Sequence, residues 1–245
     1  MYIDDDNLIQ TDDFLYEIPY YDKLGYKLSN GILKPRMGRS KLTYVADHLR
    51  YLDDMTIFRI GTGLLKKPLN GIHGELLIAK GDLLKEITFN RKTITEDFAF
   101  SREAYRNKVK IWQSSTEVSI LSPHSIKDFI KQRNRWYKGI KEDIKTAPLL
   151  MKLFSGIRII DWKIGIIGSW LLMPLWFLLQ LPIYWVLFNL IGSVYYYSAY
   201  IWGVSKIKGF WNTLRYTYLI PLCGIMETVA PHFHSKNKGF VVIDK

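Results

Sequence analysis

The sequence predicts an α/β domain followed by membrane-spanning helices, and three observations lead to that expectation. Apolar residues recur at helical spacing from about Ser40 to Phe58, which predicts an amphipathic helix. The short apolar run from Leu76 to Ala79 is typical of a buried strand. No charged residue occurs between Ile164 and Ser205, a stretch about twice the roughly 20 residues that cross a bilayer once.

Shorter elements alternate along the amino-terminal part of the chain. In chain order we expect a strand at residues 1–3, an exposed loop at 30–39, a helix at 80–90, a helix at 95–106, strands at 108–113 and 117–121, and a helix entered through the turn at 122–125. The loop is predicted from Gly31, Pro35 and Gly38, because glycine and proline interrupt regular structure.

The composition limits the kinds of partner that the chain is expected to bind. Its 245 residues carry a formal charge of +11, which calls for an acidic ligand or surface. Phosphorylated donors and anionic lipid headgroups both meet that need. We exclude nucleic acid, because the basic residues are scattered and no nucleic-acid-binding signature is present. Cys223 is the single cysteine of the chain, so no intrachain disulfide is possible.

Thr95-Glu96-Asp97 is the first candidate for chemistry, and two interpretations remain open. In one, Thr95 caps a helix and the two acids lie in its first turn, where the helix dipole favours them. In the other, Asp97 is a general base that takes a proton from an acceptor hydroxyl, with Glu96 beside it. Apolar neighbours would hold Asp97 at a buried rim and raise its pKa toward a useful value.

A second cluster, Gln132 to Trp136, follows on a helical pattern. Gln132, Arg135 and Trp136 share one side of that helix. Arg135 is suited to stabilise a departing diphosphate by charge-assisted hydrogen bonds, and the Trp136 ring to wall an acceptor pocket. The alternative is an ordinary basic amphipathic helix that lies against a membrane surface.

Two further stretches carry polar candidates. Asp4-Asp5-Asp6 follows an apolar stub, and carboxylates at a strand end are hard oxygen ligands for a divalent cation. A solvated acidic terminus is the alternative. His73, Gly74 and Glu75 end the second of two glycine-containing segments, 61–63 and 68–75, directly before a predicted strand. Small residues there let a ligand approach the backbone, although a plain turn explains the glycines equally.

Taken together in this order, the Asp4-Asp5-Asp6, Thr95-Glu96-Asp97 and Gln132-to-Trp136 motifs resemble those of the processive-type family-2 glycosyltransferases. Within that group, the run that starts at Gln132 and the tail at 239–245 look most like the egghead-type β-1,4-mannosyltransferases. The resemblance implies a GT-A (Rossmann-like) α/β domain that moves a hexose, of mannose or glucose type, from a GDP- or UDP-sugar to a lipid or polysaccharide hydroxyl, with inversion.

The resemblance also implies a role for each candidate residue. Asp4 and Asp6 would hold Mn²⁺ or Mg²⁺, with Asp5 as the alternative if the register differs by one. Asp97 would be the base, with Glu96 beside it. The other candidates would bind diphosphate and acceptor: Gln132, Arg135, Trp136, His73, Gly74 and Glu75.

Relatives of this kind place a complete βαβ region with the nucleoside pocket ahead of the Asp-x-Asp strand. We therefore expect the catalytic domain to be truncated at its amino end and to depend on a missing half or a separate subunit. The rival hypotheses are a non-catalytic fragment or accessory subunit that keeps the motifs, and a basic peripheral protein that binds anionic lipid.

The expected organisation has three parts. Residues 1–150 form the partial catalytic domain, 151–205 an interface segment and a transmembrane hairpin divided near Gln180-Leu181-Pro182, and 206–245 a basic loop, an interfacial or re-entrant helix and a tail. Basic residues on both sides of the hairpin predict an integral membrane protein whose catalytic part and tail are cytoplasmic. A third crossing by 216–230 is the alternative.

Overall fold

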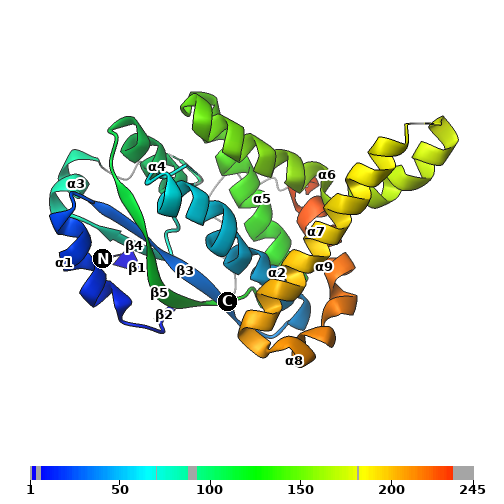
Figure 1. Cartoon of the computed structure of the whole chain (residues 1–245), viewed down its shortest axis with the longest axis horizontal. Coiled ribbons are helices and arrows are strands. Elements are labelled where there is room, and N and C mark those ends of the chain that lie inside the picture. Colours follow the sequence, from blue (N-terminus) through cyan, green and yellow to red (C-terminus); the bar gives the residue numbers. More distant parts are fainter. Residues whose placement is uncertain (1, 4–6, 70, 88–92, 181, 234–245) are drawn as a thin grey trace.

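The structure is a computed structural model that describes residues 2–3, 7–69, 71–87, 93–180 and 182–233 (Figure 1). The candidate metal ligands Asp4 and Asp6 lie outside the described residues, as does the tail at 234–245. The domain boundaries predicted from the sequence remain predictions.

Strands and helices alternate in the first half of the chain, and helices make up the second half. The strands are β1 (Tyr2–Ile3), β2 (Leu8–Ile9), β3 (Leu28–Arg36), β4 (Leu76–Ala79) and β5 (Ile111–Leu121). The helices are α1 (Asp13–Lys23), α2 (Lys41–Asp53), α3 (Gly81–Glu86), α4 (Glu96–Arg106), α5 (Ile126–Asp143), α6 (Leu149–Leu179), α7 (Ile183–Lys208), α8 (Phe210–Leu214) and α9 (Ile220–Val229). Short irregular helical segments are η1 (Asp54–Leu64), η2 (Ile144–Thr146), η3 (Thr217–Leu219) and η4 (Ala230–His232).

The described strands form one mixed sheet in the order β1-β4-β3-β5-β2, so the predicted α/β class is confirmed. Strands β3 and β5 are parallel, and the other pairs are antiparallel. β3 therefore occupies the centre of the sheet, and the exposed loop predicted at 30–39 is wrong over most of its length. Gly31 is a packing requirement: a Cβ there would lie 2.4 Å from Cδ2 of Leu76 on the neighbouring strand.

The two strands predicted at 108–113 and 117–121 are one continuous strand, β5. The polar residues between the two predicted strands form hydrogen bonds with Glu17 of α1. The Ser115 backbone N–H donates to Glu17 Oε1 at 2.8 Å, and the Ser114 hydroxyl also donates to Glu17. Because these groups have partners, the strand passes through the polar stretch without a turn.

Alternate residues of the strands face opposite sides of the sheet and pack under different helices. In β4, Leu76 and Ile78 belong to a cluster with Trp112, which α1 covers through Phe14 and Ile18. The intervening residue, Leu77, belongs to a second cluster that contains residues of α3 and α4. This alternation is the pattern of a sheet buried on both faces.

The helix predicted from 40 to 58 ends earlier in the structure than expected. α2 ends at Asp53 and the chain continues as the wide π-type segment η1 to Leu64. Near the end of η1 the Thr62 hydroxyl contacts both the Phe58 carbonyl, at 2.7 Å, and Gln113 Oε1, at 2.8 Å. This places Phe58 beside the sheet end at which the candidate site lies.

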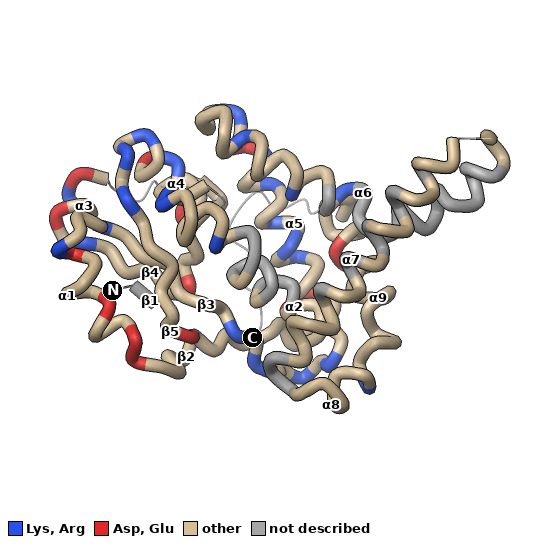
Figure 2. Tube along the Cα trace, in the orientation of Figure 1, with Lys and Arg blue, Asp and Glu red and all other residues tan. Residues whose placement is uncertain are grey.

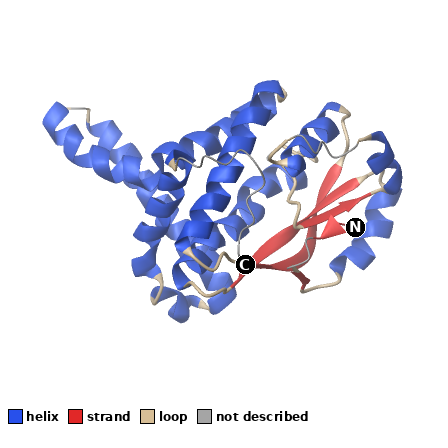
Figure 3. Cartoon of the chain, turned by 180° about the vertical axis from the view of Figure 1, so that it is seen from behind, coloured by secondary structure: helices blue, strands red, loops and turns tan. Residues whose placement is uncertain are grey.

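Most of the helices lie on one side of the molecule and the sheet on the other (Figure 3). α2 packs with α5, α7 and α9 around a shared apolar cluster that includes Tyr44, Phe129, Tyr200 and Cys223. The carboxyl-terminal segment at 220–233 therefore contacts the helix that carries the Gln132-to-Trp136 motif.

The hairpin predicted between 151 and 205 is present as two helices, α6 and α7, which project from the body of the molecule (Figure 1). The described residues of its outer part are tan in Figure 2, so they include no Lys, Arg, Asp or Glu, whereas residues of these types are spread over the body. Over the described residues, none of the helices combines the length and the apolar character that a bilayer crossing needs, so that part of the expectation is not supported.

Candidate active site

Asp97 lies in the first turn of α4, as the sequence predicted, but the start of that helix differs from an ordinary cap. Thr95 occupies the N-cap position without a side-chain cap hydrogen bond. Its hydroxyl instead donates to Asp143 Oδ2 of α5 at 3.1 Å. Gly139 permits this contact, because a Cβ at that position would lie 2.4 Å from Thr95 Cγ2. The start of α4 is thus tied to α5.

Asp97 is half-buried, and it lines a pocket. Burial is the main cause that raises the pKa of Asp97, and the neighbouring charge of Glu96 adds to it. The Phe98 backbone N–H, which donates to Asp97 Oδ1 at 2.7 Å, lowers the pKa, as do the charges of His73 and Arg135. The net shift is upward, toward the range in which a carboxylate works as a general base.

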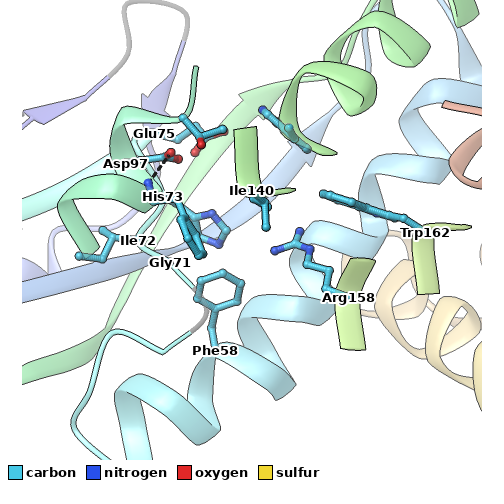
Figure 4. Close-up of a pocket in the computed structure, with 12 residues that line it drawn as sticks. Phe58, Gly71, Ile72, His73, Glu75, Asp97, Ile140, Arg158 and Trp162 are labelled. Atoms are coloured by element: carbon cyan, nitrogen blue, oxygen red, sulfur yellow. Dashed lines mark hydrogen bonds between the residues drawn. The ribbon is translucent and has the colours of Figure 1, made fainter. Parts of the chain in front are cut away.

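A single pocket brings several of the predicted residues together (Figure 4). Its polar lining is His73, Glu75, Thr95, Asp97 and Arg158. Its aromatic lining is Phe58, Phe98, Trp136 and Trp162. Carboxylates beside flat aromatic rings match the two surfaces of a sugar, whose hydroxyls accept and donate hydrogen bonds while its C–H faces pack on aromatic rings.

The loop before β4 positions His73 and Glu75. Gly71 has φ +96°, a conformation that favours glycine, and turns the chain toward the pocket. The His73 backbone N–H donates to Asn30 Oδ1 at 2.9 Å, and its ring packs on Phe58 with 4.3 Å between centroids. The backbone of Gly74 passes close to Asp97, because a Cβ on it would lie 3.9 Å from the Asp97 Cβ.

The residues of the second motif divide between the pocket and its support. Trp136 lines the pocket. Arg135 is partly exposed and acts electrostatically on Asp97. Gln132 is buried behind the pocket, where its Oε1 accepts a hydrogen bond from Arg133 Nη1 at 2.7 Å. The structure therefore brings His73, Glu75, Asp97 and Trp136 into the lining of one pocket, and Gln132 lies outside that lining.

Sequence reasoning missed Arg158 and Trp162, which enter the pocket from α6. The Arg158 guanidinium carbon lies 4.9 Å from the centre of the Trp162 ring, and both side chains line the cavity (Figure 4). A spacing of four residues puts them on one face of the helix. That signal was available in the sequence, but the basic residues that precede the predicted hairpin, Arg158 among them, were interpreted only as determinants of membrane orientation.

The described residues contain no group of three or more histidine, cysteine, aspartate or glutamate side chains arranged to hold a metal ion. The residues that flank Asp4 to Asp6 reach the pocket's edge. Ile3 pairs with Leu76 at the start of β4, and Asn7 Nδ2 donates to the Glu75 carbonyl at 3.3 Å. Asn7 Oδ1 is buried and has no hydrogen-bond partner among the described residues, so a hard oxygen atom is available at this edge.

Several named proteins resemble the sequence of this chain at low identity. The chain is 24% identical to the β-1,4-mannosyltransferase bre-3 of Caenorhabditis briggsae over 98% of its own length, and 24% identical to that of Caenorhabditis elegans over the same share. It is 30% identical to the β-1,4-mannosyltransferase egh of Drosophila melanogaster over 49% of its length and 28% of that relative. The chain spans 58% of the length of the two bre-3 proteins.

The family comparison covers more of the chain and agrees with the order of the motifs. Residues 1–223 match the family described as glycosyl transferase family group 2. That range includes the sheet, the helix that begins beside Asp97 and the helix that carries Trp136. The resemblance predicted from the motifs is confirmed: this chain belongs to glycosyl transferase family group 2.

Proposed function

We propose that the chain transfers a hexose from a nucleotide sugar to an acceptor hydroxyl, with Asp97 as the general base. The observation that carries the proposal is the setting of the Asp97 carboxylate. It is half-buried, its pKa is raised, and it lines a pocket together with Trp136, Trp162, His73 and Glu75. The mixed sheet and the family membership support assignment to the GT-A fold.

The reaction follows from the groups around the pocket. Asp97 takes the proton of the acceptor hydroxyl as that oxygen attacks the anomeric carbon, and the bond to the nucleoside diphosphate breaks. One displacement with one base inverts the anomeric configuration. We assign the balance of the developing diphosphate charge to Arg158, which lines the pocket, and to Arg135, whose charge acts on Asp97. Trp136 and Trp162 would hold the sugar rings.

The donor proposal rests on the relatives. Those named above are β-1,4-mannosyltransferases, which favours a mannose-type donor carried by GDP, with a UDP-sugar of glucose type as the alternative. Identity of 24% over the chain supports the class of sugar transfer more firmly than the choice of sugar. A panel of donors is therefore part of the test.

We also propose a divalent cation, Mn²⁺ or Mg²⁺, held by Asp4 and Asp6. Their carboxylates and the buried Asn7 Oδ1 are hard oxygen donors of the kind these ions prefer. When bound, the ion would supply positive charge to the diphosphate of the donor. The proton transfer assigned to Asp97 does not pass through it.

A membrane location and a lipid acceptor are proposed from the surface of the hairpin. Its outer part exposes large apolar side chains, among them Leu178 at 77%, Ile183 at 70% and Ile191 at 68%. An exposed apolar surface of this kind marks contact with a membrane or another protein. The proposed orientation keeps the pocket on the cytoplasmic side, where nucleotide sugars are available. A polysaccharide acceptor is the alternative.

The test is metal-dependent release of nucleoside diphosphate from GDP- and UDP-sugars by the full chain in membranes. Turnover with one donor, lost in Asp97→Asn and kept in Asp82→Asn, a change of an exposed carboxylate on α3, supports the proposal and identifies the sugar. Equal release by the wild type and Asp97→Asn would overturn the role of Asp97. No release with any donor would favour the rival hypothesis of a non-catalytic chain.

A further inference from the structure

The buried side chain of Arg133 donates a hydrogen bond from each of its three nitrogen atoms, and the three acceptors lie on different helices. Its Nε donates to Glu227 Oε1 of α9 at 2.9 Å, and its Nη2 donates to Asp47 Oδ1 of α2 at 2.7 Å. Its Nη1 donates to Gln132 Oε1 at 2.7 Å on its own helix, α5. The Arg133 side chain is 3% exposed, that of Asp47 0% and that of Glu227 7%.

The flat faces of the same guanidinium are also occupied. Its central carbon lies 4.2 Å from the centre of the Phe129 ring and 4.4 Å from the centre of the Trp136 ring. A cation this close to the face of an indole is attracted by the ring's quadrupole, more strongly when water is excluded. Arg133 therefore contacts two residues of the sugar-transfer motif at once: Gln132 through a hydrogen bond, and Trp136 through its ring.

We propose that Arg133 is a positioning residue for sugar transfer, which holds Gln132 and Trp136 in their working orientation and is itself held by Asp47 and Glu227. The proposal rests on the proposed function, because Trp136 is taken to wall the acceptor site. On this proposal α9 helps to support the pocket, although no described residue of α9 lines it.

The geometry explains why an arginine is needed. A guanidinium presents its donors in a fixed plane, so three partners in different directions and two stacked rings determine its orientation completely. A lysine carries one rotating ammonium and offers neither the separate donors nor the flat face. Arg133→Lys therefore keeps the charge but loses the geometry.

A residue outside the direct contacts of Arg133 also contributes to the charge balance of the cluster. Arg133 faces two carboxylates, and the charge of Arg158, at the pocket, acts on Glu227 as well. Removing one partner of such a buried cluster leaves an uncompensated charge, whereas a well-packed apolar cluster is often equally stable. A costly ionic cluster behind Trp136 is thus better explained by positioning than by stability.

The first experiment measures the environment of the Trp136 ring without any substrate. The purified full chain, with its eight tryptophans replaced by 5-fluorotryptophan, gives a ¹⁹F NMR spectrum. Comparison with Trp136→Phe identifies the Trp136 resonance. We expect that resonance to shift or broaden in Arg133→Lys and in Glu227→Leu, and to stay in place in Glu227→Gln, which keeps an oxygen acceptor.

Thr228→Val is the matched control on the same helix. Thr228 is also buried, and its hydroxyl donates to the Gly224 carbonyl within α9 at 2.9 Å. The change removes a buried polar group next to Glu227 without touching the arginine cluster. An unmoved Trp136 resonance in Arg133→Lys and Glu227→Leu, equal to that in Thr228→Val, would overturn the proposal whether or not the chain is active.

The second experiment measures turnover in a double-mutant cycle. We expect Arg133→Lys to lower kcat by up to about 100-fold in the wild-type background, the scale of a misplacement near 1 Å. In the Trp136→Phe background its effect should be at least about fivefold smaller, because Arg133 acts in part through that ring. Equal effects in both backgrounds would contradict positioning through Trp136. An inactive wild type would refute the proposed function, while the ¹⁹F spectra would still test the contact.

Discussion

A methyl group added at Gly139 tests how the start of α4 is held. The new Cβ would lie 2.4 Å from Thr95 Cγ2 and 2.5 Å from Thr95 Oγ1. Overpacking of this kind costs about 1–3 kcal/mol. Displacing Thr95 also weakens its hydrogen bond to Asp143, worth about 1 kcal/mol. Alanine gains about 0.5–1 kcal/mol over glycine inside a helix, so we expect Gly139→Ala to lose about 1–3 kcal/mol of unfolding free energy.

The same change should reduce turnover more than its effect on stability suggests. To reach the ordinary contact distance of 3.4 Å, Thr95 must move by about 1 Å, and Asp97 follows two residues later. A misplacement of that size near the reacting atoms can cost up to about 100-fold in kcat. Thr95→Ala in the same chain removes both close atoms and should recover part of the lost stability.

Urea unfolding and nucleoside diphosphate release measure the two effects. Gly156→Ala on α6 is the control, because no atom lies within 4 Å of the Cβ it would add. We expect that variant to gain about 0.5–1 kcal/mol and to keep its kcat. If Gly139→Ala behaves like Gly156→Ala in both assays, the close contact between α5 and Thr95 does not position Asp97.

Four further outcomes follow from the site. Asp97→Asn should lose turnover yet unfold at a higher temperature at neutral pH, because a carboxylate whose pKa is raised by folding costs stability once pH exceeds that pKa. Glu96→Gln should move the acid limb of kcat/KM to lower pH, since the charge of Glu96 helps to raise the pKa of Asp97. Arg158→Ala should raise the KM for donor or acceptor by about tenfold or more, as expected for a lost charged contact. Ser125→Ala should cost about 0.5–2 kcal/mol, because Ser125 caps α5 through the Asp128 N–H at 3.1 Å.

Each of these outcomes has a result that would contradict it. Melting temperatures that fall in Asp97→Asn at neutral pH would argue against a raised pKa. An unmoved acid limb in Glu96→Gln would mean that another group titrates. Lys163→Ala, a change of an exposed residue on α6, is the control for Arg158→Ala. Equal KM values in the two variants would show that Arg158 does not bind the donor or the acceptor. Full stability of Ser125→Ala would refute the cap.

The sequence predicted the elements whose chemistry is local. The strand at Leu76–Ala79 and the helix start at Thr95 agree with the structure, because an apolar run and acidic residues in the first turn of a helix act over a few positions, although the Thr95 hydroxyl bonds Asp143 and does not cap the helix. The central strand β3 was missed, since Gly31 and Pro35 are read as loop residues when the neighbouring strand is unknown. Only the contact of Gly31 with Leu76 explains the glycine.

The site was predictable where motif and fold coincide, and not where distant segments meet. Asp97 and Trp136 were found through the types and order of their neighbours, and the structure brings them to one pocket. Arg158 and Trp162 belong to that pocket only because α6 folds back on α5. Arg133 stands inside the predicted motif, but its role depends on Asp47 and Glu227, which no local pattern connects to it.

The arginine cluster has a consequence for the order of folding. Arg133 is separated by 86 residues from Asp47 and by 94 from Glu227, and Cys223 reaches Leu42 across 181 residues. Contacts between segments so far apart form slowly, because the chain must close long loops first. α9 should dock late, and until it does the Arg133 guanidinium lacks its second carboxylate, Glu227. The pocket would therefore be completed among the last steps of folding, and a local opening of α9 would disable it before the sheet unfolds.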